Sequence, residues 1–167
     1  MTFNKGDVVQ YGLEGVCTIE DIVKRPFRDE MKKYYVLHPV FNANATLYVP
    51  FDNEVLVGRM RYTLTEKDFK TLIKKTTDAD CAWIPNEAER KVRYKEIIHG
   101  GDRKEIVALM KTLYIHKEEQ ASLGKKMHVA DEKFFNDAER IIFDEFAVAM
   151  GITPNEVLPY MEKLFNK

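Results

Sequence analysis

Hydrophobic and polar residues follow different periods in the two halves of the chain. Between residues 6 and 57, short apolar runs are separated by glycine, proline and asparagine, a pattern typical of β-strands joined by tight turns. The expected strands cover residues 7–11, 16–23, 33–37 and 45–49, with 55–57 as a short fifth. Pro26 and the charged run at residues 28–30 predict a loop between the second and third strands. This half predicts a small SH3/Tudor-like β-barrel.

From residue 65 onward the apolar residues recur with helical spacing. Thr65 and Asp68 form a capping-box pattern that opens a helix over residues 65–75. The expected later helices run from Pro85 to about 99, from 102 to about 119, through residues 134–149 up to Gly151, and from 153 onward. The second half therefore predicts an all-helical domain of four to five helices.

The change of period predicts the domain organisation of this α+β chain. We expect a β-barrel domain at residues 1–60, a helix and connector at 61–82, and a helical domain at 83–167.

No apolar run approaches the roughly 18 residues that span a bilayer, and the N-terminus lacks the apolar core of a signal peptide. Cys17 and Cys81 match no metal spacing and are expected as buried or half-buried thiols in a reducing cytoplasm.

Charge adds information only through its distribution. The formal net charge of the chain is −1. Residues 90–126 nevertheless hold ten basic residues against five acidic ones, whereas residues 127–167 hold four basic against eight acidic. Such an asymmetry allows one basic face on a nearly neutral molecule, although solvated helix faces explain the same pattern.

The residues that support catalysis do not occur in the required patterns. The four histidines, His38, His99, His116 and His128, form no HExxH or HxH pair, and no cysteine lies near any of them in sequence. Neither a phosphate-binding glycine loop nor a GxSxG nucleophile motif is present. We therefore expect no metal, no cofactor and no enzymatic activity.

Several segments together resemble a known family. The opening residues 3–16, with Gly6-Asp7-Val8-Val9 at their centre, are similar to the start of the CarD/CdnL family of bacterial transcription regulators. The same module occurs as the polymerase-interaction domain of the transcription-repair coupling factor. The resemblance continues through residues 34–37 and 47–50, and in the helical half through Arg93-Tyr94-Lys95 and residues 101–114.

The resemblance implies that the barrel binds the β subunit of RNA polymerase. In the family, edge-strand pairing and basic residues at the end of the second strand and in the fourth strand make this contact. Lys24 and Arg25 match the first basic position, whereas Tyr48 occupies the second and departs from the family pattern. Main-chain pairing at a sheet edge tolerates such a change.

The resemblance further implies that the helical domain contacts promoter DNA without reading its sequence and stabilises the open complex. In the family, a tryptophan at a helix start wedges into the minor groove, and basic residues hold the backbone. Aligned on Arg93-Tyr94-Lys95, that tryptophan falls at Arg90, and Trp83 lies seven residues earlier, about two helical turns. The candidate DNA-binding residues are Trp83, Arg90, Lys91, Arg93, Lys95, Lys125 and Lys126.

Two other functions remain open. The first is an adaptor without a DNA contact, in which the Tudor-like barrel and the helical domain each bind a protein; the near-neutral charge of the helical domain is compatible with it. The second is an enzyme, which would require a polar pocket with perturbed titratable groups. The role of Trp83 is also open, because a role as DNA wedge competes with packing of the connector against the core.

Overall fold

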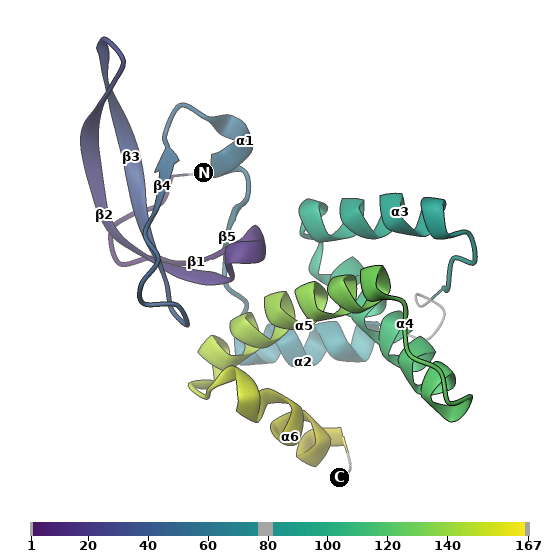
Figure 1. Ribbon diagram of the computed structural model, residues 1–167. Coiled ribbons are helices and arrows are strands. Elements are labelled where there is room, and N and C mark those ends of the chain that lie inside the picture. The colour runs from purple at the N-terminus through teal and green to yellow at the C-terminus, as the bar shows by residue number, and fades with distance from the viewer. Residues whose placement is uncertain (1, 77–81, 166–167) are drawn as a thin grey trace. The chain divides into compact units, whose positions relative to one another are not determined.

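The chain folds into two compact units, Met1–Thr63 and Leu64–Lys167. The computed structural model describes residues 2–76 and 82–165. All strands that it describes belong to the first unit, and the long helices belong to the second (Figure 1). This arrangement of a small antiparallel β unit and a helical unit confirms the predicted α+β class.

The N-terminal unit is built on one five-stranded antiparallel sheet with the order β4-β3-β2-β1-β5. Its elements are β1 (Val8–Tyr11), the short 3-10 helix η1 (Gly12–Glu14), β2 (Val16–Phe27), β3 (Glu30–Pro39), β4 (Leu47–Pro50), α1 (Glu54–Val57) and β5 (Met60–Tyr62). The last strand returns to pair with the first, with Val9 opposite Tyr62. That return of the last strand to the first is the connection expected of the SH3/Tudor-like architecture.

Alternation along the strands sends one set of side chains into a single core. Val9, Ile19, Tyr35 and Leu37 are each at most 2% exposed within this core. The Phe51 ring stacks on Tyr35 with 3.9 Å between centroids. As expected, Cys17 is buried in the same cluster; Cys81 lies outside the described residues.

The β2–β3 hairpin is longer than the sequence predicted. Strand pairing continues through Pro26 opposite Met31 to Phe27 opposite Glu30, so the loop expected from Pro26 onward is wrong. Proline fits here because β1 pairs only with the first residues of β2, which leaves this end of β2 as a sheet edge that needs no N–H. Arg28 makes the turn with a positive φ of 56°. Figure 1 shows β2 and β3 extending as a two-stranded ribbon past β4.

The expected fifth strand at residues 55–57 is also wrong, because α1 occupies this position. Asn53 caps that helix through its side chain, which accepts a hydrogen bond from the Leu56 N–H at 3.0 Å. The strand that completes the sheet comes a few residues later, at β5. A local cap therefore overrode the apolar run Val55-Leu56-Val57.

The helical unit contains five helices in the described residues: α2 (Glu66–Lys75), α3 (Glu87–Gly100), α4 (Arg103–Ser122), α5 (Val129–Met150) and α6 (Pro154–Phe165). The predicted capping box at Thr65 and Asp68 is confirmed. Asp102 caps α4 by accepting from the Glu105 N–H at 3.0 Å. Gly151 ends α5 in the left-handed conformation, as its position predicted.

A buried acid joins three segments of this unit. Glu145 on α5 is fully buried. It accepts hydrogen bonds from the Arg103 guanidinium on α4, at 2.7–3.1 Å, and from the Leu64 N–H, at 2.8 Å. Aromatic packing adds to this core, with the Phe69 and Phe146 rings edge to face at 5.2 Å. The first residue of the helical unit is thereby tied to its centre.

Candidate binding surfaces

One face of the sheet carries an exposed pairing of a cation with aromatic rings. Arg25 on β2 lies over the Tyr48 ring of β4, with the guanidinium carbon 4.0 Å from the ring centroid. Tyr48 is 39% exposed and meets the Tyr34 ring edge to face at 6.5 Å. A guanidinium held flat on an aromatic ring keeps its N–H groups available at the edge, which suits recognition of a carboxylate.

A shallow polar hollow of 350 Å³ adjoins this pairing, and Arg25 and Tyr48 form part of its lining. Two charged pairs form another part of its lining. The Lys5 amino group lies 3.7 Å from Asp21, and the His38 Nε2 atom lies 2.6 Å from the Glu20 carboxylate. The hollow thus offers both signs of charge around one exposed guanidinium, an arrangement suited to a polar protein surface.

Lys24 does not share this face. Successive strand residues point to opposite sides of a sheet, so the side chains of Lys24 and Arg25 leave β2 in opposite directions. Lys24 stands directly opposite Lys33 on β3, and Arg25 stands opposite Lys32. Of the two basic residues expected at one polymerase contact, the structure therefore places only Arg25 beside Tyr48.

In the helical unit, Trp83 is half-buried between two other side chains. Its ring stacks on His116 of α4 with 3.6 Å between centroids and 16° between planes. The guanidinium of Arg90 also lies over the indole ring, with its central carbon 4.3 Å from the ring centroid. This placement corresponds to the packing alternative, because the indole would have to leave the stack before it could enter a groove.

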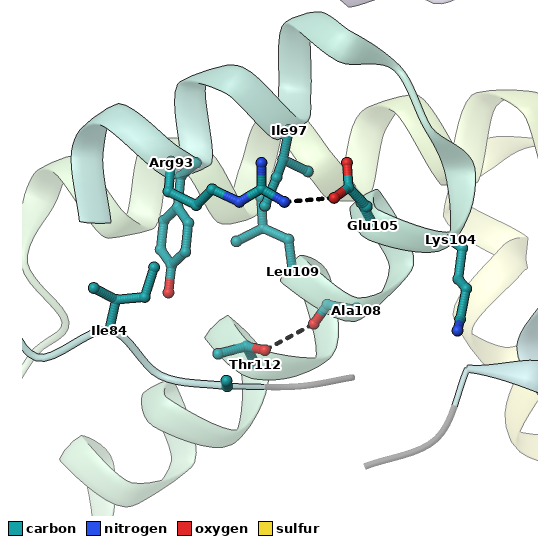
Figure 2. Close-up of a pocket in the computed structure, with 10 residues that line it drawn as sticks. Ile84, Arg93, Ile97, Lys104, Glu105, Ala108, Leu109 and Thr112 are labelled. Atoms are coloured by element: carbon teal, nitrogen blue, oxygen red, sulfur yellow. Dashed lines mark hydrogen bonds and ion pairs between the residues drawn. The ribbon is translucent and has the colours of Figure 1, made fainter. Parts of the chain in front are cut away.

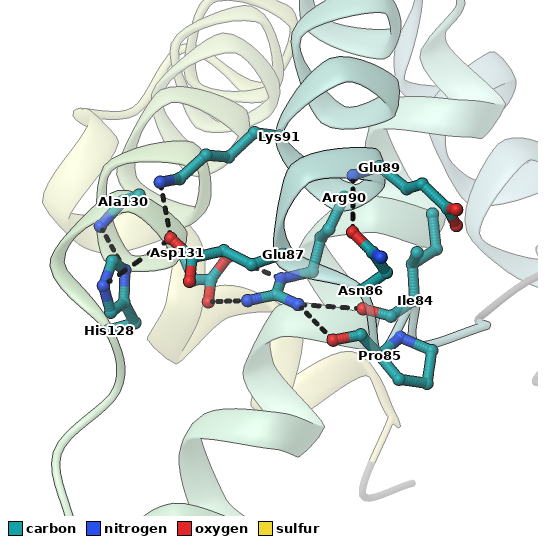
Figure 3. A network of polar contacts seen from close by, with 10 residues as sticks. All are labelled: Ile84, Pro85, Asn86, Glu87, Glu89, Arg90, Lys91, His128, Ala130 and Asp131. Atoms are coloured by element: carbon teal, nitrogen blue, oxygen red, sulfur yellow. Dashed lines mark hydrogen bonds and ion pairs between the residues drawn. The ribbon is translucent and has the colours of Figure 1, made fainter.

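Arg90 is buried and its guanidinium is occupied by partners within the chain (Figure 3). Its Nε and NH2 groups each donate to Asp131 of α5 at 2.9 Å. NH1 donates to the carbonyl oxygens of Ile84 and Pro85 at 2.9 and 3.2 Å. Hydrogen bonding to Asp131 raises the pKa of Arg90. The expectation that Arg90 contacts DNA does not fit this placement, because tertiary structure brought a buried acid from another helix against it.

Two further candidates on α3 lie in exposed ion pairs. Lys91 bonds Glu87 one turn earlier at 2.5 Å. Arg93 pairs with Glu105 of α4 and approaches Glu96. Exposed pairs of this kind contribute little stability and can exchange partners, so both cations stay accessible.

Lys95, Lys125 and Lys126 differ from these residues. All three are exposed, and no carboxylate of a described residue lies within 4.0 Å of their amino groups. Lys95 continues the row formed by Glu87 and Lys91, one helical turn on. Lys125 and Lys126 follow Gly124 in the loop between α4 and α5. These cations are the most available of the predicted set.

One contact brings that loop toward the start of α3. His128, which caps α5, has its Nε2 atom 3.9 Å from the Glu87 carboxylate that also binds Lys91 (Figure 3). This contact places His128, where the loop ends, beside the start of α3. We call Lys91, Lys95, Lys125 and Lys126 the basic patch.

A cavity of 340 Å³ lies between α3 and α4. Figure 2 shows apolar side chains from both helices around it, with the Arg93–Glu105 ion pair at one edge. Tyr94 also lines it, and its buried hydroxyl has no hydrogen-bond partner among the described residues. Burial raises the pKa of Tyr94 to about 12, so the hydroxyl stays neutral at physiological pH. Among the groups that line this cavity, Tyr94 offers no acid–base chemistry.

Comparison with known proteins identifies the first of the two units. Residues 3–61 match the family model described as the CarD-like/TRCF RID domain. The N-terminal unit is a CarD-like domain. Over 162 residues the chain is 24% identical to a Bacillus subtilis protein named "Putative transcription factor YdeB", and the match covers 93% of this chain and 97% of that protein. These matches confirm the predicted resemblance to the CarD family and support a transcription-related role.

The match to the CarD-like domain spans the first four strands and reaches into β5, so it includes Arg25 and Tyr48. Two further features of the described residues bear on other functions. The described residues hold no group of three or more histidine, cysteine, aspartate or glutamate side chains that could bind a metal ion. No described helix is both long and apolar enough to cross a membrane.

Sequence reasoning missed three residues that shape these surfaces. Asp131 and Glu145 are buried acids that bind Arg90 and Arg103, and each partner is 41 or 42 residues away in sequence. No local pattern marks such a pair. Lys33 could have been found, because a hairpin register with a two-residue turn places it opposite Lys24.

Proposed function

We propose that the chain is a non-enzymatic transcription regulator of the cytoplasm that binds the β subunit of RNA polymerase and contacts promoter DNA, stabilising the open complex. The CarD-like domain would make the polymerase contact, and the basic patch of the helical unit would make the DNA contact. The family match over residues 3–61, which is nearly the whole β unit, is the observation that carries the proposal.

For polymerase, the proposed surface is the Arg25–Tyr48 pairing and the adjoining edge of the sheet. Strand β4 pairs with β3 on one side only, so its outer edge presents main-chain groups that another strand could use. Tyr48 stands where family members carry a basic residue. Its ring instead supports the Arg25 guanidinium at 4.0 Å, which keeps a positive charge at the same surface.

The polymerase contact is tested by capture of the isolated β subunit on the immobilised full chain. Arg25→Glu should weaken the complex at least 10-fold, because it removes a charge-assisted contact and opposes a carboxylate. Tyr48→Ala should weaken it less, since the edge of β4 remains. The matched control is Lys67→Glu on α2, which changes the net charge by the same amount. Equal affinity of Arg25→Glu and the wild type would remove this surface from the proposal.

For DNA, the proposed contacts are backbone phosphates held by the basic patch. Lysines in a loop and along one helix row bind phosphate without reading bases, which agrees with a factor that acts at many promoters. We give the primary role to these lysines rather than to Trp83, because the indole is held between His116 and Arg90. A wedge role for Trp83 would require that stack to open.

Fluorescence anisotropy with a forked promoter duplex at several salt concentrations tests this contact. Lys125→Gln/Lys126→Gln should reduce the slope of log affinity against log salt by about 2, because two phosphate contacts are lost. Trp83→Ala should leave that slope unchanged. If polymerase and the full chain together show no salt-dependent change on DNA, the DNA contact is refuted.

That refuting result would favour the adaptor instead. The observation in its favour is that Arg90, Lys91, Arg93 and Arg103 all have acidic partners within the helical unit, which reduces the charge available to DNA. In that case, the CarD-like domain would retain its polymerase contact while the helical unit binds a protein.

A further inference from the structure

The β2–β3 ribbon carries an unusual concentration of positive charge. Residues 24–33 contain five basic and two acidic residues, and both acids, Asp29 and Glu30, lie at or beside the turn. Behind the turn, Lys24 stands opposite Lys33 and Arg25 opposite Lys32. Like charges directly opposite each other destabilise a sheet, so local folding does not explain two consecutive pairs.

The two pairs are not equivalent, because they lie on opposite faces of the ribbon. On one face, Arg25 rests on Tyr48 and Lys32 bonds Asp52 at 2.6 Å. On the other face, Lys33 lies over the Phe51 ring at 4.5 Å. Neither Lys24 nor Lys33 has a carboxylate of a described residue within 4.0 Å. This second face therefore presents two adjacent cations without an acid to balance them.

The same face continues toward the turn with apolar side chains. Pro26 stands opposite Met31, which is 64% exposed. This face of the two-stranded ribbon therefore carries the cations Lys24 and Lys33 and, nearer the turn, the exposed side chain of Met31. Phosphates spaced along a nucleic-acid backbone fit adjacent cations, and apolar side chains beside them can contact sugars. A two-stranded ribbon is also narrow enough to lie along a duplex groove.

We propose that this face, formed by Lys24, Lys33 and Met31, is a second nucleic-acid contact that binds backbone phosphates. The inference rests on the proposed function, since a ribbon with polymerase on its Arg25 face would present Lys24 and Lys33 on the side away from polymerase. The CarD-like domain would then hold polymerase and nucleic acid on opposite faces of the same two strands.

Binding of the full chain to a fluorescein-labelled 30-base-pair duplex of arbitrary sequence, measured by anisotropy between 50 and 200 mM KCl, tests the inference. Lys24→Gln/Lys33→Gln should lower the salt slope by about 2 and weaken binding at every salt concentration. Lys67→Gln/Lys70→Gln on α2 removes the same charge elsewhere and is the matched control. It should change the slope by less than 1.

The outcomes separate this inference from the proposed function. If Lys125→Gln/Lys126→Gln lowers the slope and the ribbon variant does not, the ribbon contact is overturned and the basic patch stands. If only the ribbon variant lowers it, the ribbon contact holds and the basic patch fails. If the ribbon variant weakens capture of the polymerase β subunit without DNA as much as Arg25→Glu does, the face belongs to a protein interface and the inference is overturned.

Discussion

Basic side chains have different partners in the two units. In the helical unit, Arg90 and Arg103 are bound by the buried acids Asp131 and Glu145. In the CarD-like domain, Arg25 and Lys33 rest on aromatic rings, and Lys24 faces Lys33. Helix packing brought acids from distant segments against these cations of the helical unit, whereas the pleat of a narrow ribbon left the cations of the CarD-like domain exposed.

This difference between the two units explains under which condition a basic stretch of sequence indicates a binding surface. Residues 90–126 looked basic, but several of these cations have structural partners. The ribbon has a smaller excess of charge, yet two of its cations lack an acidic partner among the described residues. What matters for binding is therefore the charge left after pairing, which is a tertiary property.

Among the changes that test this comparison, replacement of Arg90 should have the largest effect on the free energy of unfolding. Its side chain is 7% exposed and that of Asp131 is 2% exposed, so Arg90→Ala leaves a buried carboxylate unpaired. We expect a loss of about 3–5 kcal/mol in the free energy of unfolding. Urea unfolding followed by Trp83 fluorescence measures it, because the indole lies in the same unit. Arg93→Ala removes a 46% exposed arginine, and its cost should stay below about 1 kcal/mol. An equal loss of unfolding free energy in Arg90→Ala and Arg93→Ala would contradict the distinction between buried and exposed arginines.

A smaller, pH-dependent effect is expected at Tyr94. Burial raises its pKa to about 12, whereas an unfolded tyrosine ionises near pH 10. The stability that this shift contributes is present below pH 10 and is lost as the pH rises through 12. Tyr94→Phe cannot ionise, so the wild type should lose about 1 kcal/mol relative to the variant between pH 10 and 11.

Urea unfolding of both proteins at pH 8, 10 and 11 provides the measurement. At pH 8 the variant should be as stable as the wild type or more so, because the buried hydroxyl has no hydrogen-bond partner among the described residues. A pH profile that is identical in the two proteins would show that Tyr94 ionises as an exposed residue does.

Reversal of one charge on the ribbon should stabilise it. Lys24→Glu places a carboxylate opposite Lys33 and replaces a like-charge pair with an ion pair. We expect a gain of about 0.2–1 kcal/mol, seen as slower amide hydrogen exchange along β2 and β3. Lys24→Gln is the control and should give a smaller gain. Faster exchange in Lys24→Glu would mean that the two lysines do not repel each other.

The smallest effect is expected at the exposed pair on α3. Lys91→Gln breaks the contact with Glu87, whose pKa is lowered mainly by its hydrogen bond to Lys91. Because both side chains are about half exposed, the free energy of unfolding should change by less than about 0.5 kcal/mol. A much larger loss would show that exposed pairs of this unit are structural as well, and would weaken the case for the basic patch.

Local sequence determined most of the elements. Period-two and helical spacing, together with the caps at Thr65, Asp102 and Gly151, predicted the strands, the helices and the change between them. The motif at residues 3–16 led to the family that the match over 3–61 confirms. Prediction failed at residues 55–57 and at Pro26, where a side-chain cap and an open sheet edge decided the structure.

Tertiary structure alone decided which candidate residues are available. Register placed Lys24 and Arg25, neighbours in sequence, on opposite faces of a ribbon. Packing of α3 against α5 brought Asp131 to Arg90. The segment that precedes α3 lies against α4, where Trp83 stacks on His116. Local residue patterns specify the φ/ψ preferences and the buried side of an element. The partners of a charged or aromatic side chain depend instead on segments tens of residues away, which meet only when the chain has folded.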